Sequence, residues 1–566
     1  MAAPFPEARD MFFRPARPLT AVLLSALLVT GLMAGCGGQP GEETANRPES
    51  PADPASQPRR GGTVVVGWSA EPTGVNELIA PGTAVTTEVV RQLFLQLFQE
   101  QPDFETNPAT FKPGLASSYE WSADHKVLTV HLLPEAVWSD GVPITADDVR
   151  WTWQAQKSPD VAWDSAYMVE PITDVEVVDP KTVRVHYSRA YAKQLQDVNE
   201  GVILPKHAWE KIPFSEWRNN ADWFREHLVV SGPFTVGSWE PQQQVVLVRN
   251  PRYFRKDRPL LDKVVIRNVP DQASLMTQLY SGAIDFAPQV SPNEADRVKA
   301  DPKLELIPYW FRTYVGVIWN HRNPLFADAD VRRALTLAID RQTLVDTLWP
   351  AGTGRVATSP ILQSVWANDR SIEPLPYDPA EARRILEAEG WKDTNGDGLL
   401  DKGGRPFSFV LLSNAGNQQR NDAAVMIQDQ LKKAGIRVEP RVVEFNSMIS
   451  DAQGGTFEAM VFGLTMDTSM DLTGLYNSEQ VVEGNFGAYK NPELDRLMAQ
   501  AMATPEIRDA QPVLNRIQQI IHRDQPTTLL WESQRLSAVN RRVHDARPNV
   551  LFSLFNLEEW WVEPAR

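Results

Sequence analysis

FSFVLLSNAGNQQRNDAAVMIQDQLKKAGIRVEPRVV, residues 407–443, is the stretch that decides the fold class. Residues 407–412 form an apolar run typical of a buried strand, and residues 421–434 predict a helix with one apolar face. That face consists of Ala424, Ile427, Leu431 and Ala434. Gly435 then ends the helix, and residues 436–443 predict a second strand. Because a strand, a helix and a strand in this order build parallel sheet, we expect an α/β protein.

The segment before this unit predicts another helix, from Asp378 to Glu389. Asp378 is placed to cap its first turn, Glu381 completes a capping box, and Pro379 fits the first helical position. Gly390 ends the helix. Short strands are predicted elsewhere, at residues 63–66 and 126–133, and they alternate with amphipathic helices.

DTNGDGLLDKGG, residues 393–404, connects that helix to the strand at residue 407. Its alternating oxygen-bearing residues resemble the start of a calcium loop, with Asp393, Asn395, Asp397 and Asp401 as the candidate ligands. An EF-hand also needs an acidic residue at the twelfth place, where this chain has Gly404. We interpret the segment as a tight turn, since Asn, Asp and Gly tolerate positive φ. Calcium stays open as the alternative.

The first residues of the chain indicate export. Three arginines precede an apolar run from residue 19 to residue 33, which is the layout of a signal peptide. The run is short for a membrane span, which needs about 20 apolar residues. It ends in LMAGC, residues 32–36, which resembles the cleavage box of a bacterial lipoprotein, although Met33 stands where a residue such as Leu is usual. We therefore expect a signal peptide at 1–35 and a lipid on Cys36, the one cysteine of the chain.

The composition describes an exported globular protein of several lobes. With 566 residues the chain exceeds one core, so two or three lobes are expected. Residues 36–61 are rich in Gly, Pro, Ser and Glu and predict a flexible tether after the lipidated cysteine. The net charge of −16 disfavours nucleic acid as a partner. Since no cysteine follows Cys36, the folded part has to be stable without disulfides.

Motifs for catalysis give no support to an enzyme. The sequence has no G-x-S-x-G, no phosphate-binding glycine loop followed by lysine, and no H-E-x-x-H. Its eight histidines are scattered, so no histidine metal site and no cofactor are expected. A carboxylate pair for glycoside hydrolysis is neither indicated nor excluded, because 72 acidic residues supply too many candidates.

Several segments, in order, resemble the extracellular solute-binding proteins of ATP-binding-cassette importers for oligopeptides, dipeptides and nickel. They are GLASSYEWSADHKVLTVHLLPEAVWSDGVPITADDV (114–148), SGPFTVGSWEPQQQVVLVRNPRYF (231–254), LYSGAIDF (279–286) and YVGVIWNHRNPLFADADVRRALTLAIDRQTLV (314–345). In the last segment Asp330 is expected to cap a helix, with Arg332 and Arg333 on its solvated face. We interpret the matched segments as mainly architectural.

The resemblance implies a periplasmic-binding-protein type II fold: two α/β lobes with an extra domain inserted in the first lobe. It places lobe I at 62–104, 229–305 and 526–566, the inserted domain at 105–228, and lobe II at 306–525. A solute bound between the lobes would favour a closed state through contacts to both.

The resemblance also suggests residues for the site. Peptide-binding relatives hold the amino end of a peptide with an aspartate, and that position falls on Asp467 in LTMDTSMDL. Leu464 and Leu472 replace the tryptophan and proline of the family pattern, so peptide specificity is less secure than the fold. Further candidates for substrate binding are Trp68, Glu71, Asn485, Tyr489 and Trp531. Plain packing is the competing interpretation for the tryptophans, and no role is assigned to Asn485 or Tyr489.

These observations predict a non-enzymatic, monomeric receptor that delivers a peptide-like solute to a membrane permease. The expected location is the periplasm or the cell surface, with the membrane reached through the lipid. One alternative keeps the fold and binds an oligosaccharide or a metal chelate. Another, from a different class, is a secreted, lipid-anchored hydrolase of glycans, with tryptophan platforms and a carboxylate pair.

Overall fold

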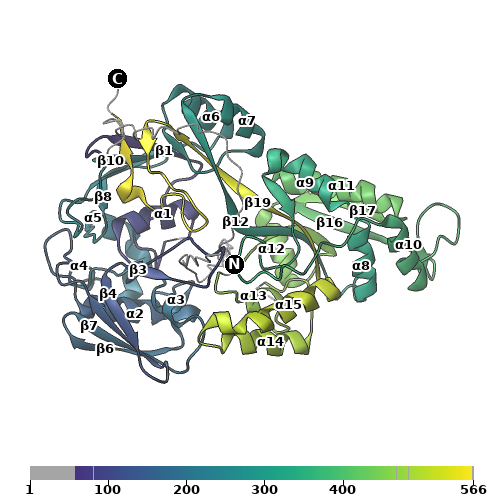
Figure 1. Cartoon of the computed structure of the whole chain (residues 1–566), viewed down its shortest axis with the longest axis horizontal. Helices are drawn as coiled ribbons and strands as arrows, with labels where there is room; N and C mark the ends of the chain where they lie inside the picture. The colour runs from purple at the N-terminus through teal and green to yellow at the C-terminus, as the bar shows by residue number, and fades with distance from the viewer. Residues whose placement is uncertain (1–57, 81, 467, 482–483, 564–566) are drawn as a thin grey trace, which may run out of the picture.

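The protein has two α/β halves that share one large sheet (Figure 1). The computed structural model describes residues 58–80, 82–466, 468–481 and 484–563. The sheet has eleven strands, ordered β17-β16-β18-β12-β19-β11-β1-β10-β9-β8, with β13 paired to β19. Its strands are β1 (Thr63–Trp68), β8 (Phe234–Glu240), β9 (Gln244–Arg249), β10 (Lys263–Asn268), β11 (Phe286–Ala287), β12 (Leu304–Trp319), β13 (Gly354–Val356), β16 (Ser408–Asn414), β17 (Arg437–Val443), β18 (Ala459–Thr465) and β19 (Thr527–Asn540).

The first half, on the left of Figure 1, contains β1 and β8 to β11 and a separate four-stranded sheet. That second sheet has the order β4-β5-β7-β6, is antiparallel throughout, and packs against α2. Its elements are β4 (Ala116–Trp121), β5 (Val127–Leu132), β6 (Ile172–Asp179), β7 (Thr182–Tyr187) and α2 (Ala146–Lys157). The other helices of this half are α1 (Ala84–Leu93), α3 (Gln194–Val198), α4 (Lys206–Trp209), α5 (Ala221–Glu226), α6 (Gln272–Ser281) and α7 (Ala295–Ala300). The turns and edges add the short strands β2 (Phe98–Glu100), β3 (Phe111–Pro113), β20 (Val543–His544) and β21 (Trp561–Val562).

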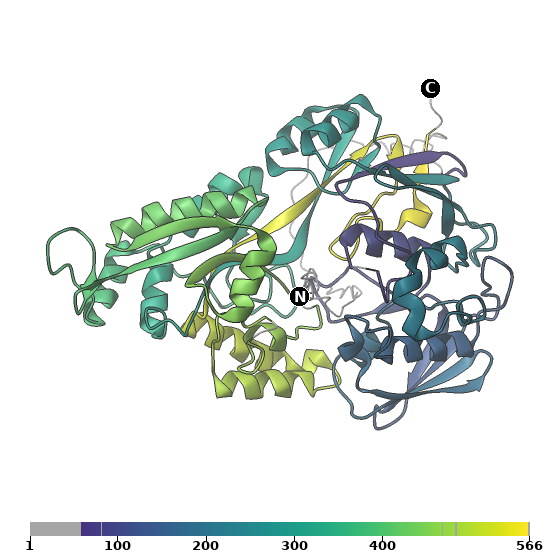
Figure 2. The ribbon, with the colours of Figure 1, turned by 180° about the vertical axis from the view of Figure 1, so that it is seen from behind.

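The second half, on the right of Figure 1, is built on β16 to β18. Seen from behind in Figure 2, its helices cover the sheet and extend to the lower edge of the molecule. These helices are α8 (Ala329–Leu337), α9 (Arg341–Leu348), α10 (Pro379–Ala388), α11 (Gln418–Lys433), α12 (Phe445–Gly454), α13 (Thr473–Tyr476), α14 (Pro492–Met502) and α15 (Gln511–Asp524). A small hairpin, β14 (Asp401–Lys402) and β15 (Arg405–Pro406), precedes β16.

The strand-helix-strand unit predicted at residues 407–443 is confirmed. β16 and β17 pair in parallel, and α11 connects them. The helix begins at Gln418, three residues before the prediction, because the side chain of Asn417 accepts a hydrogen bond from the Arg420 N–H and so caps the first turn. β17 is one of the two outer strands of the sheet, the other being β8, and Pro440 within β17 lacks the N–H that another strand would need.

Two predictions about helix ends need correction. Asp378 caps α10 as expected, but Glu381 pairs with Arg384 and does not complete a capping box. Asp328, not Asp330, caps α8.

Arg332, predicted on a solvated face, is only 3% exposed. It is buried because its guanidinium donates to the carbonyls of Asp524 and Gln525 at the end of α15, and also to those of Phe326 and Ala327. Carbonyls at a helix end have no partner within the helix, so a buried guanidinium is a suitable donor for them.

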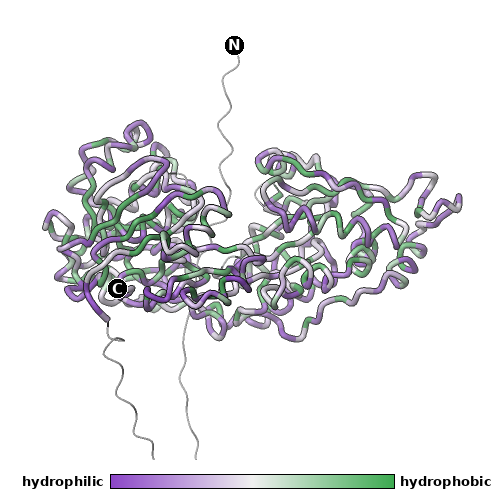
Figure 3. The backbone as a smooth tube through the Cα atoms, turned by 90° about the horizontal axis from the view of Figure 1, so that it is seen from above, coloured by the Kyte–Doolittle hydropathy of each residue, from purple (hydrophilic) through white to green (hydrophobic). Residues whose placement is uncertain are grey.

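Apolar residues fill both halves. In Figure 3, hydrophobic residues lie inside each half and hydrophilic residues lie along the outer loops. One cluster extends from Val64 to Val562 in the first half, and two others fill the second half on the two sides of its sheet. Within the described ranges, no helix has the length and apolar character needed to cross a membrane.

Candidate ligand-binding site

The two halves are connected by β12 and β19, which pair antiparallel from Leu304 to Ile318 of β12. Both strands are buried near one end, where they enter the core of the second half, and become accessible in the middle. The accessible segments are residues 308–313 of β12 and 533–535 of β19. The pairing is irregular at this place, with a register shift between Trp310 and Tyr314. A partly open strand pair between two cores is therefore the first candidate for a site.

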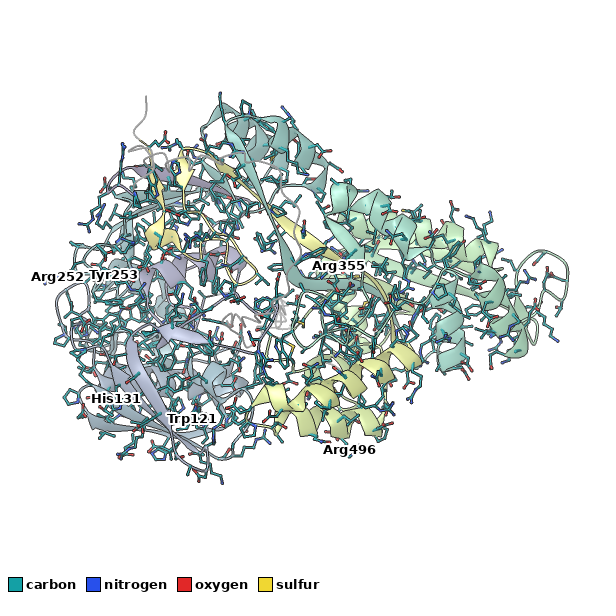
Figure 4. All side chains as sticks on the ribbon, in the orientation of Figure 1. Trp121, His131, Arg252, Tyr253, Arg355 and Arg496 are labelled. Atoms are coloured by element: carbon teal, nitrogen blue, oxygen red, sulfur yellow. The ribbon has the colours of Figure 1, made fainter. Side chains whose placement is uncertain are left out.

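Aromatic and guanidinium groups meet on this segment. The guanidinium of Arg355 lies 3.8 Å from the ring centre of Trp310, and that of Arg535 lies 3.5 Å from the ring centre of Phe311. In Figure 4 Arg355 is labelled beside the paired strands β12 and β19, in the middle of the molecule. Stacked guanidinium and aromatic groups offer both a flat apolar face and donors for anionic groups.

Glu532 holds Arg355 in this position. Its carboxylate is 1% exposed and receives two hydrogen bonds from Arg355, at 2.9 and 2.7 Å, and one from the Gln363 N–H at 3.0 Å. Burial raises the pKa of Glu532, while Arg355 and the backbone N–H of Gln363 lower it. The pair fixes β13 and the loop after it against β19.

Arg420 forms a second basic position, at the carboxyl ends of the parallel strands β16 and β18. Its Nη1 donates to Asn414, the last residue of β16, at 2.9 Å, and its guanidinium lies 5.4 Å from the ring centre of Phe462. Gly463 leaves the necessary room, because a Cβ there would come within 2.3 Å of the Arg420 Nη2. Ligands of open parallel sheets bind beyond the carboxyl ends of the strands, which is where this guanidinium lies.

The charge of Arg420 is only partly compensated by the part of the chain that the structure describes. Its Nε is buried without a hydrogen-bond partner, and no ion pair of Arg420 with a residue of the described ranges is recorded. Burial lowers the pKa of Arg420 to about 10. A poorly solvated cation without an acidic partner is costly, so an anionic group on a ligand would be favoured here.

The described residues among those predicted from the sequence lie in different surroundings. Trp531 is 1% exposed and packs in the core of the second half beside Trp349, which argues against its predicted place on a cleft wall. β19 has already entered that core at this residue. Trp68 is partly buried against the core of the first half. Glu71 accepts a hydrogen bond from the Gln242 N–H and so fixes a turn.

Asn485 and Tyr489 hold a loop together. The Asn485 amide donates to the carbonyls of Asn477 and Tyr489, and the Tyr489 hydroxyl donates to Asp524 at 2.6 Å. Both side chains are buried. Asp467 lies outside the described residues; the strand before it, β18, ends at Thr465.

The 393–404 segment has the hydrogen bonds of a turn. Asp393 accepts from the N–H groups of Gly396 and Gly398, Asp397 accepts from Leu399, and Asp401 accepts from Thr394. These oxygens satisfy the backbone of the loop, as the turn interpretation predicts. The acidic groups of the described residues that lie close enough to share an ion are Asp328, Asp330 and Glu389, outside this segment.

Sequence reasoning missed Arg355, Arg420 and Arg535. Arg355 and Arg535 become significant only through pairing with distant strands, which no local pattern reveals. Arg420 carried a signal: it stands in the first turn of a helix, where acidic residues are favoured and a cation opposes the helix dipole. A residue that violates its local preference is a candidate for function.

Comparison with known proteins finds relatives along nearly the whole chain. The sequence model for "Bacterial extracellular solute-binding proteins, family 5 Middle" matches residues 110–485. The oligopeptide-binding protein AppA of Bacillus subtilis (strain 168) is 31% identical over 561 residues, which cover 96% of this chain and 99% of AppA. Heme-binding protein A of Haemophilus influenzae is 24% identical and covers 93% of this chain and 95% of its own length.

Solved structures show the same architecture. Bacillus subtilis AppA in complex with a nonapeptide has a TM-score of 0.75 and 31% identity, covering 90% of this chain and 100% of AppA. NikZ of Campylobacter jejuni in complex with Ni(L-His) has a TM-score of 0.74 and 22% identity, covering 88% and 99%. Two α/β halves joined by a strand pair thus define a type II periplasmic binding protein. The chain belongs to the bacterial extracellular solute-binding proteins of family 5.

Proposed function

We propose that the protein is the substrate-binding component of an ATP-binding-cassette importer, and that it captures a peptide-like solute between its two halves and delivers it to a membrane permease. The observation that carries this proposal is the nearly end-to-end similarity to AppA, whose structure holds a nonapeptide. The receptor binds and releases the solute unchanged and requires no cofactor.

The two ends of a peptide would meet different residues. The family resemblance assigns the amino group to Asp467, and the geometry of Arg420 suits a carboxylate. Trp310 and Phe311, with their stacked guanidiniums, would contact the solute between these ends. A zwitterionic solute is favoured because its carboxylate supplies a counter-charge that none of the described residues offers Arg420.

A metal chelate is the second candidate on the same fold. The relation to NikZ, which holds Ni(L-His), supports the fold and keeps this class in view. A chelate with free carboxylates would use Arg420 but would not need Asp467. An oligosaccharide would need neither charge.

The hydrolase alternative loses support because members of this family are substrate-binding proteins of transporters. Turnover of a panel of glycans would restore it.

The anchor and the division of the chain are proposals as well. Cys36 and residues 1–57 lie outside the described residues, so the signal peptide, the lipid and most of the tether rest on the sequence pattern. Residues 105–228 are proposed as the inserted domain, which the separate four-stranded sheet within them supports.

Lipidation is tested with Cys36→Ser, which should move the protein from the membrane fraction to the soluble exported fraction. Unchanged membrane association would contradict lipidation.

The test of the proposed function uses peptides. A pool of random nonapeptides is added to the protein, and thermal unfolding is measured with and without the pool. A solute at 100 times its dissociation constant stabilises the folded protein by about 2.7 kcal/mol. A bound nonapeptide is then identified by mass spectrometry and prepared in four forms, with the amino end free or acetylated and the carboxyl end free or amidated.

Two variants assign the ends. Asp467→Asn should weaken binding of the free-amine forms about tenfold or more and leave the acetylated forms nearly unchanged. Arg420→Gln should do the same for the free-carboxylate forms relative to the amidated ones. Equal loss for all four forms would contradict the assignment of that residue. Stabilisation by chelates or oligosaccharides but by no peptide would overturn the proposed solute class.

A further inference from the structure

Apart from β12 and β19, the two halves are bridged by the loop of the β2-β3 hairpin, residues 101–110, which we call the strap. Its base belongs to the first half: Phe98 of β2 is buried in the core there and contacts Phe111 of β3. From this base the loop extends to the second half. β-Hairpin loops usually have about two to five residues, so the loop at 101–110 is long for a hairpin.

The strap inserts one side chain into the second half. Phe104 is 5% exposed and belongs to a hydrophobic cluster whose other buried members in the described ranges lie between residues 314 and 529, apart from Val550 and Leu551 of the C-terminal segment. Its carbonyl accepts a hydrogen bond from the Trp366 N–H at 2.9 Å. Phe104 is the one buried residue of the strap, and burying a phenyl ring removes a large apolar area from water, so Phe104 is its main anchor.

Polar contacts secure the strap beside this anchor. Arg508 of the second half donates to the Thr106 carbonyl at 3.2 Å and to the Asn107 side chain. The same guanidinium lies 5.4 Å from the ring centre of Trp366. Arg508 itself is exposed, so these contacts form at the edge of the buried anchor and not within a core.

A second bridge lies close to the strap. The Ala192 N–H donates to the Met502 carbonyl at 3.0 Å, and Lys193 pairs with Asp471 at 3.6 Å. Ala192 and Lys193 lead into α3 of the first half, while Met502 ends α14 of the second. Figures 1 and 2 both show α14 near α3 at the lower edge of the molecule, with β12 and β19 crossing higher up. The halves therefore meet through β12 and β19 and, lower in these views, through the strap and this second bridge; Val550 and Leu551 of the C-terminal segment also join the cluster of Phe104.

We propose that the strap is a latch: anchored by Phe104, it holds the two halves together on the side away from β12 and β19, and the halves separate by its release. Separation at this side has to withdraw Phe104 from its cluster and break the bridge at Ala192, whereas β12 and β19 need only bend. The latch thus sets how often the space between the halves is open to a solute, because a binding site is available only in proportion to the population of its competent state.

The test uses the full chain without any solute, so its outcome is independent of the identity of the solute and of the proposed function. Hydrogen exchange reports two amides that the bridges protect, those of Trp366 and Ala192. In Phe104→Ala we expect both amides to exchange about tenfold faster or more, while amides of β12 paired with β18 keep their rates. Small-angle X-ray scattering should show a larger radius of gyration.

Two further variants serve as controls for Phe104→Ala. Phe111→Ala removes the same ring from the base of the same hairpin and should leave the Ala192 amide unchanged, because Phe111 packs within the first half. Arg508→Gln changes an exposed residue, so the variant is expected to fold, and it should accelerate exchange at Trp366 by a smaller factor. Unchanged exchange at Ala192 and an unchanged radius of gyration in Phe104→Ala would overturn the latch, as would an equal effect of Phe111→Ala.

Discussion

Glu88 shows how a single residue makes the stability of this protein depend on pH. It lies on α1, is 5% exposed, and accepts hydrogen bonds from the N–H groups of Ser553 and Leu554 at 2.5 and 2.9 Å. Burial raises the pKa of Glu88 from 4.5 to about 7, although these two N–H groups and the charge of Arg535 lower it. Between about pH 4.5 and pH 7, Glu88 therefore keeps its proton in the folded protein and has lost it in the unfolded chain.

The sign of the pH dependence follows. Because the folded pKa lies above the unfolded one, the contribution of Glu88 is fully present below pH 4.5 and is lost as the pH rises to about 7, by up to roughly 3 kcal/mol. Urea unfolding of the wild type and of Glu88→Gln at pH 5 and pH 8 measures the difference. The variant should lose less stability over this range.

The wild type has to be compared with Glu88→Gln because His321 also makes the stability depend on pH. Burial lowers the pKa of His321 to about 3, so its contribution has the opposite sign and grows as the pH rises toward 6.5. His321 and Glu532 are present in both proteins and cancel in the difference. An identical loss of stability in wild type and variant would show that Glu88 does not titrate in this range.

At the residue scale, the sequence predicts roles that depend on neighbouring residues better than it predicts which side chains are buried. Asp378 was a correct cap because its role depends on residues within three places of it. Trp531 is buried on β19 and Arg332 is buried against the end of α15, and no local pattern shows this because both depend on partners far along the chain. Asp467 stays a prediction.

At the scale of elements, α8 and α15 are joined through one side chain. Arg332 of α8 donates to the carbonyls of Asp524 and Gln525, where the dipole of α15 is negative. Arg332→Met should lower the free energy of unfolding by about 2 to 4 kcal/mol, because several buried carbonyls lose their donor. Urea unfolding measures the loss.

Arg333 is the matched control. It is the next residue of the same helix and is partly exposed, so Arg333→Met should change the free energy of unfolding by less than about 0.5 kcal/mol. Similar losses in the two variants would mean that helix propensity, and not the contacts of Arg332, is responsible.

The elements that the sequence predicted well are those with local signals. The unit from β16 to β17 follows from apolar periodicity and from Gly435, and its parallel pairing follows from the crossover. The pairing of β12 with β19 could not be predicted, because more than two hundred residues of sequence separate many of the paired positions. Arg355 and Arg535 lie beside β12 through that pairing and through its irregular register, so the basic and aromatic segment was missed with it.

At the scale of the whole molecule, the continuous sheet predicts that both halves unfold together. β12 and β19 contribute to the cores of both halves, so neither half retains its full sheet once the other is lost. In hydrogen exchange at increasing denaturant, amides of β1 and β10 should lose protection at the same concentration as those of β16 and β18. Loss of protection in two separate steps would contradict this expectation.

The family and the type II fold were predicted from the order of sequence segments, and both are confirmed. The bridges between the halves were not predicted. Phe104 lies in a segment without periodicity, and the sequence gives no sign that its ring joins the cluster against which Trp366 packs.

The outer strand β17 has a consequence for the protein in crowded surroundings. An uncovered sheet edge is a template on which copies of a protein can polymerise. Pro440 interrupts the row of donors on this edge, and Arg437, Glu439 and Arg441 present exposed charges along it. Many copies packed at high concentration should therefore resist joining edge to edge into fibrils.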